Sequence, residues 1–203
     1  TLRQGVRNLN EGISLLNIVD GAINEEVSIL IRMRELSQQA STGTIGATER
    51  QSTNLEFDAM RTELNRISKT TEYNGIKLLD GSLSSAASEH ISIQFGLDSK
   101  ADNNININRA VNVTSLTALS LNLNGLSVAT QDGAIKANEA LQVTMNSLNK
   151  IRGRLGSTHN ILERSLNNTL TSAENLTAAG STISDADMAS EFARLTKQQI
   201  LVQ

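Results

Sequence analysis

Long, uninterrupted helical periodicity is the feature that most constrains the fold of this chain. Apolar residues recur at spacings of three, four and seven across residues 1–41 and again across residues 132–179. None of the 203 residues is proline, and a proline inside a helix costs about 3 kcal/mol. Very long helices are therefore permitted. We predict a mainly α fold, an elongated antiparallel helical bundle with two N-terminal helices and one long C-terminal helix.

The first two helices are predicted to form an antiparallel hairpin. Residues 1–41 carry two apolar rows on different faces, so this helix should be contacted from more than one side. Two glycines interrupt the pattern in residues 41–46, and a second helix begins at Ala47 or Thr48. Because the connection is short, the two helices should pack antiparallel, side by side. Arg32 and Glu56 are then expected at nearly the same position along the axis of the hairpin. The rows are Val6, Leu9, Ile13, Leu16, Ile23, Val27 and Leu30, then Leu15, Ile18, Ala22, Ile29, Met33, Leu36 and Ala40.

Residues 73–108 change to a period of two. Asn74-Gly75 and Asp80-Gly81 are turn signals. Residues 90–95 and 104–108 alternate apolar and polar side chains, which predicts a β-hairpin lying on the helices. Residues 111–130 lack a clear period and are predicted to be a connecting segment. The apolar face of the hairpin would consist of Ile91, Ile93, Phe95, Ile105 and Ile107.

The third helix is predicted from about residue 132 to residue 179, a length of roughly 70 Å. Gly180 is interpreted as its stop, and Ser184 as the cap of a further amphipathic segment, residues 185–203. Gly156 is interpreted as a point of close helix approach, and both chain ends as cuts through continuing helices. The expected organisation is one rod: residues 1–110, a connection over residues 111–130, and the long helix of residues 131–203.

Composition argues against several classes of function. The net charge is -3, so there is no basic field to attract nucleic acid or an anionic membrane surface. The absence of cysteine removes disulfides and thiolate chemistry, and two histidines give little basis for a metal site. His159 is expected at the edge of the core rather than as a ligand, and His90 has no companion. We therefore predict no enzyme, no cofactor and no metal.

Five stretches, in this order, resemble the bacterial flagellin family: residues 7–14, 34–40, 66–81, 154–163 and 183–201. The resemblance implies a structural filament subunit that self-assembles for motility, is secreted through the flagellar export machinery, and resides in the extracellular flagellum. It further implies a rod that lacks the terminal helices and the variable outer domains, and that is expected to be monomeric alone. Two alternatives stay open: a hook–filament junction protein, and a non-flagellar helical signalling rod.

The same resemblance implies a receptor-binding and inter-subunit surface at Arg32, Leu36, Gln39 and Glu56. These positions match those that host Toll-like receptor 5 recognises in flagellins. Leu36 is expected to be exposed beside the two charges, and Met60 stands where receptor-active members commonly have a basic residue. The simpler alternative is an ion pair on a solvated helix face, which stabilises little.

Overall fold

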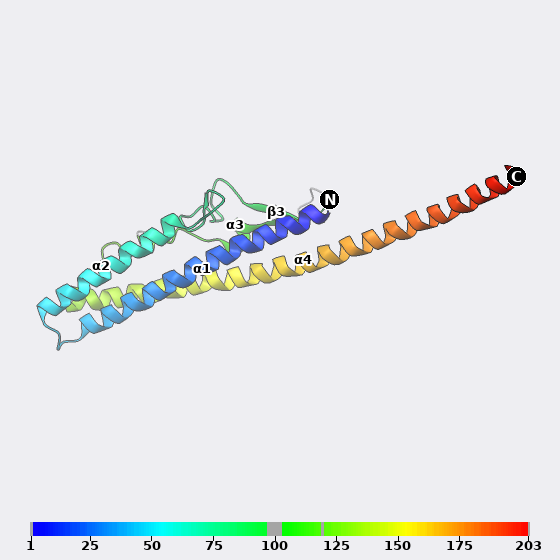
Figure 1. Cartoon of the computed structure of the whole chain (residues 1–203). Coiled ribbons are helices and arrows are strands. Elements are labelled where there is room, and N and C mark those ends of the chain that lie inside the picture. Colours follow the sequence, from blue (N-terminus) through cyan, green and yellow to red (C-terminus); the bar gives the residue numbers. More distant parts are fainter. Residues whose placement is uncertain (1, 97–102, 119, 203) are drawn as a thin grey trace.

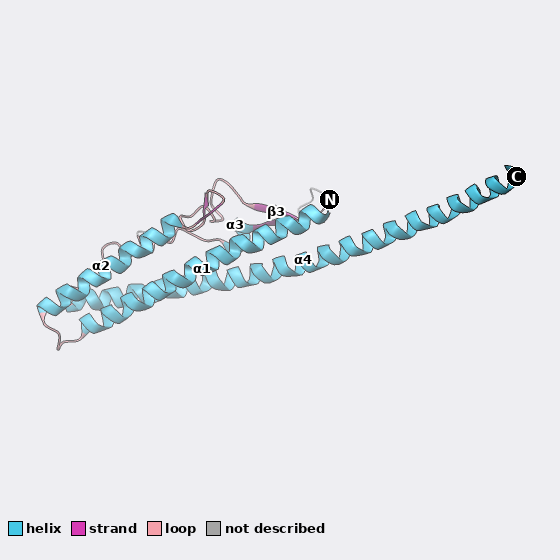
Figure 2. Cartoon of the chain, viewed as in Figure 1, coloured by secondary structure: helices cyan, strands magenta, loops and turns pink. Residues whose placement is uncertain are grey.

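The chain folds into a long helical rod, as predicted (Figure 1, Figure 2). The computed structural model describes residues 2–96, 103–118 and 120–202, with only the helical backbone described for residues 183–189 and 202. The helices are α1 (Leu2–Ser41), α2 (Ala47–Thr70), α3 (Ile107–Val111) and α4 (Gln131–Val202). The strands are β1 (Glu72–Tyr73), β2 (Ile76–Lys77), β3 (Ser92–Gln94) and β4 (Asn104–Asn106).

The central contact of the rod is between α1 and α4, which run antiparallel (Figure 1). Asp20 lies opposite Arg152, and the Ser41 carbonyl accepts a hydrogen bond from Gln131 Nε2 at 3.1 Å. Both helices bury a leucine-rich row at intervals of seven, the spacing of a coiled-coil seam. The rows are Leu9, Leu16, Ile23 and Leu30 on α1, and Leu141, Leu148, Leu155 and Leu162 on α4. Each such side chain contributes about 1.5–3 kcal/mol on burial.

The second apolar row of α1 is buried as predicted at Leu15, Met33 and Ala40 but not at Ile18, which is 39% exposed. The Arg32–Glu56 hydrogen bonds define how α1 and α2 are aligned along the rod axis. At that register, Thr70, the last residue of α2, is level with Ile18. Glu25 and Arg32 follow Ile18 at intervals of seven and are exposed too, so this face of α1 is open to solvent.

The predicted connecting segment is a structural part of the rod. Residues 112–118 and 120–130, here called the strap, lie between α2 and α4. On the α2 side, Asn54 Oδ1 accepts the Val128 N–H at 2.8 Å, and Asn65 Oδ1 accepts the Ala118 N–H at 2.9 Å. On the α4 side, Thr144 Oγ1 donates to the Leu121 carbonyl at 3.4 Å. The strap also fills the core with Val113, Leu116, Ala118, Leu123 and Val128.

Two small antiparallel hairpins cover one end of the rod. The first pairs β1 with β2, and its turn places Asn74 at φ 51 and Gly75 at φ 80, as the Asn-Gly signal predicts. The second pairs β3 with β4, with Ile93 opposite Ile105, which confirms the predicted β-hairpin. Its second strand ends at Asn106 rather than Asn108, because Ile107 begins α3. Its connection, residues 97–102, lies outside the described residues. Ile93 and Ile107 are buried, while Ile91, Phe95 and Ile105 pack against the core from its edge.

Gly5 and Gly12 let the second hairpin lie directly on α1. A Cβ atom on Gly12 would be 2.0 Å from Ile93 Cδ1, and one on Gly5 would be 2.2 Å from the Phe95 carbonyl oxygen. Gly156, by contrast, has open space where its Cβ would be, so its interpretation as a close helix approach is wrong. The tight contacts are between α1 and the hairpin, not between α1 and α4 at residue 156.

α4 is one continuous helix of 72 residues, and the predicted stop at Gly180 is wrong. A glycine inside a helix costs only about 1 kcal/mol, and its neighbours include good helix formers. Ser184 therefore lies inside the helix and caps no helix start. The C-terminal part of α4 runs past the N-terminal end of α1 (Figure 1). Within the described residues, no helix is both long and apolar enough to cross a membrane.

The glycine contacts give a test of the fold. We expect Gly12→Ala to destabilise the chain by about 1–3 kcal/mol, because the added methyl must displace Ile93. The matched control is Gly21→Ala on the same helix, where nothing lies within 4 Å of the added atom. It should instead stabilise α1 by up to about 1 kcal/mol. Urea unfolding of both variants measures the difference, and equal effects would contradict the close contact between Gly12 and Ile93.

Candidate protein contact surfaces

Arg32 joins α1 to α2 through an ion-pair cluster on the rod surface. Its Nε and Nη2 atoms donate to Glu56 Oε1 at 2.9 and 2.7 Å, and its Nη1 donates to Glu35 Oε2 at 3.1 Å. The prediction that Arg32 lies beside Glu56 is thus confirmed. The Arg32 and Glu56 side chains are 50% and 42% exposed, so the cluster faces solvent. It combines one cation with two carboxylates.

The Arg32 guanidinium is charged, and its hydrogen bonds to Glu56 and Glu35 orient it. Hydrogen bonds to Glu56 first, and then to Glu35, raise the pKa of the Arg32 guanidinium above its usual value. A guanidinium held by two carboxylates on different helices has little freedom to reorient. The cluster therefore presents one cation and two carboxylates in a defined hydrogen-bonded arrangement.

Leu36 is only 2% exposed, so the prediction that it lies exposed beside the charges is wrong. It belongs to the second apolar row of α1, whose neighbours Met33 and Ala40 are also buried. Gln39 is exposed on the same helix, whereas Met60 packs against the core from its edge. Of the four predicted surface positions, Arg32, Gln39 and Glu56 are accessible in this chain. Leu36 anchors the helix that carries them.

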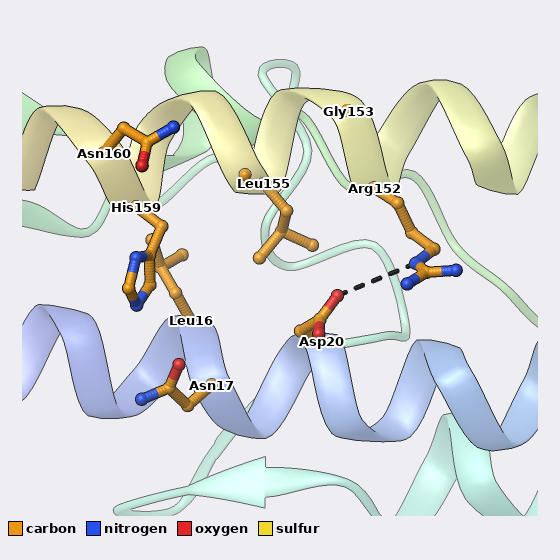
Figure 3. A pocket seen from close by; sticks show the side chains of 9 residues that line it. Leu16, Asn17, Asp20, Arg152, Gly153, Leu155, His159 and Asn160 are labelled. Atoms are coloured by element: carbon orange, nitrogen blue, oxygen red, sulfur yellow. Dashed lines mark ion pairs between the residues drawn. The ribbon is translucent and has the colours of Figure 1, made fainter.

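A second surface feature is a hollow of about 560 Å³ on the seam between α1 and α4 (Figure 3). Leu16 and Leu155 form its buried floor. Asp20 and Arg152 face each other across it, with Oδ1 and Nε 3.8 Å apart. Sequence reasoning missed this hollow, since it depends on which residues of α4 lie opposite α1.

The rim of the hollow is polar and open on the α4 side. Gly153 and Gly156 line it, and a Cβ atom on either residue would meet nothing within 4 Å. His159 sits at the edge of the core, as predicted, with Nδ1 3.7 Å from Glu163 Oε1. Among the described residues, no three His, Cys, Asp or Glu side chains are placed to hold a metal ion.

These features define a class: an elongated structural rod with contact surfaces on its sides. The chain belongs to the bacterial flagellin family. The family model of the bacterial flagellin N-terminal helical region matches residues 1–84, and that of the C-terminal helical region matches residues 139–203. The prediction from the five sequence stretches is confirmed, and flagellin is favoured over a hook–filament junction protein or a signalling rod.

Individual relatives agree with the family models. The chain is 35% identical to a flagellin of Listeria innocua, over 97% of this chain and 70% of that protein. It is 33% identical to a flagellar filament core protein of Treponema maltophilum, over 100% of this chain and 72% of that protein. The crystal structure of Bacillus cereus flagellin superposes with a TM-score of 0.67 at 29% identity, covering 86% of this chain and 94% of that one.

Family membership establishes the coarse function. Flagellins are the structural subunits of the flagellar filament, so the chain is a structural protein and not an enzyme, as predicted. The rod of α1, α2 and α4 corresponds to the fold of the solved flagellin. What the surfaces described above contact is a separate question.

The burial of Leu36 gives a direct stability prediction. Leu36→Ala should cost about 2–5 kcal/mol, since it leaves a cavity in the core. Gln39→Ala, three residues further along α1 and exposed, should change stability by less than about 0.5 kcal/mol. Denaturant unfolding of the two variants checks this. A Leu36→Ala variant as stable as the parent would place that side chain on the surface after all.

Proposed function

We propose that the chain is a secreted filament subunit that acts in motility, delivered by the flagellar export machinery and assembled by contacts between rod faces. Membership in the flagellin family supports this proposal. The hollow at Asp20 and Arg152 and the cluster at Arg32 are two sites where a neighbouring subunit has polar partners to contact.

We further propose that the face bearing Arg32, Gln39 and Glu56 is recognised by host Toll-like receptor 5. The observation that carries this proposal is the Arg32–Glu56 hydrogen-bonded pair, which holds an arginine in a fixed, half-exposed orientation across two helices. Arginine is enriched among the residues that dominate binding energy at interfaces. Leu36 acts here from the core, by fixing the position of α1 beneath the cluster.

One face serves both partners in this proposal. Inside the filament, Arg32, Gln39 and Glu56 pack against a neighbouring subunit, and in the free chain they are open to the receptor. The receptor therefore binds the monomer and not the closed filament wall. In this proposal the three side chains must therefore fit both a neighbouring subunit and the receptor.

The test is binding of the chain to an immobilised Toll-like receptor 5 ectodomain. We expect Arg32→Ala and Glu56→Ala each to weaken binding at least tenfold, because each removes a fixed charge from the contact surface. Arg66→Ala is the matched control, since the Arg66–Glu63 pair is also an exposed ion pair on α2. Circular dichroism confirms that all three variants remain helical.

Two results would contradict the receptor site. One is binding by the parent chain that neither Arg32→Ala nor Glu56→Ala weakens. The other is an equal loss in Arg66→Ala, which would indicate a general effect of net charge rather than a specific contact. Absence of binding by the folded parent chain would remove the receptor proposal and leave the filament function in place.

A further inference from the structure

Glu26 is an acidic residue in the core of the rod. Its side chain is 0% exposed, although it lies in the middle of α1. Neither carboxylate oxygen has a hydrogen-bond partner within the described part of the chain. A buried ionised carboxylate without a partner is costly, so such a group normally becomes neutral instead. Glu25, the next residue, is exposed to solvent.

Charged groups on α4 do not offset the cost of burying an ionised Glu26 carboxylate. Asp20 faces Arg152 and Ser41 faces Gln131, so Glu26 lies at about the height of Asn146 on α4. The charged residues within two turns of that position are Glu139, Lys150 and Arg152. The first two are exposed, and Arg152 faces Asp20.

Charges on α2 and on the strap do not offset the cost of burying this carboxylate either. Because Arg32 bonds Glu56, Glu26 lies at about the height of Thr62 on α2. Arg61 pairs there with Asp58 and Arg66 with Glu63, Glu56 binds Arg32, and Lys69 is exposed to solvent. The strap contributes no charge, since residues 112–130 contain no Asp, Glu, Lys or Arg. On α1 itself, Asp20 accepts from Asn24 and Arg32 is held by Glu35 and Glu56. Arg34, about two turns along α1, has a buried Nε atom that donates no hydrogen bond to Glu26.

We propose that Glu26 is a pH-sensitive element of the rod, neutral in the folded chain, whose ionisation on the alkaline side loosens the packing of α1. Burial is the physical cause, because the core offers the carboxylate neither water nor a donor. Desolvation accordingly raises the pKa of Glu26 from 4.5 to about 8. The switch acts on α1, the helix that contacts α2, α4 and β3.

The direction of the effect follows from linkage. The folded chain holds the Glu26 proton more tightly than the unfolded chain, because its pKa is higher when folded. The contribution of Glu26 to stability is therefore greatest below about pH 4.5, falls as the pH rises toward 8, and levels off above that. Between the two pKa values, each pH unit raises the unfolding equilibrium constant about tenfold.

The experiment compares urea unfolding of the chain and of Glu26→Gln at pH 5, 7 and 9. From pH 5 to pH 7, the unfolding equilibrium constant of the parent should rise on the order of a hundredfold more than that of Glu26→Gln. Glu25→Gln is the matched control and should follow the parent, because Glu25 is already solvated. Parallel pH profiles for the parent and Glu26→Gln would overturn the proposal.

Two further measurements keep the proposal testable if the glutamine variant folds poorly. Glu26→Leu removes the polar group altogether and should show the same flattened pH profile as Glu26→Gln. Carbon-detected NMR of the parent chain follows the Glu26 carboxyl directly. Titration near pH 8 supports the proposal, and titration near pH 4.5 overturns it.

Discussion

The antiparallel seam between α1 and α4 is the interaction on which the rest of the structure depends. Both helices present a buried row at intervals of seven, so the two rows stay in register over about six turns. α2, the strap and the two hairpins are then laid on this pair. The absence of proline is the sequence condition for the seam, because one proline inside either helix would break the row.

Features that depend on local sequence could be predicted, and features that depend on register could not. The helical rows, the Asn74-Gly75 turn and the alternating β3 and β4 strands follow from periodicity and turn chemistry alone. The strap was missed as a core element because its leucines follow neither helical nor strand spacing. The predicted helix end at Gly180 was wrong because a glycine ends a helix only when its neighbours do not favour helix as well. Glu26 gave no signal at all, since an acidic residue in a helix is ordinarily solvated.

The contact surfaces follow from the same geometry. The short connection after α1 fixes the height of α2, which brings Arg32 within hydrogen-bonding distance of Glu56. The row that includes Leu36 faces inward, so only the flanking positions remain for contacts with other molecules. The resemblance to flagellins predicts the surface, while the packing shows which of its side chains are exposed to solvent.

The central claim, that the face around Arg32 closes against a neighbouring subunit in the filament, has a direct test. The chain contains no cysteine, so Gln39→Cys provides a single thiol on that face. Maleimide labelling would be compared between filaments purified from cells that express this variant and the same filaments after dissociation. We predict protection in the filament and rapid labelling of the monomer. Equal labelling in both states would place this face on the open surface of the filament and contradict the claim.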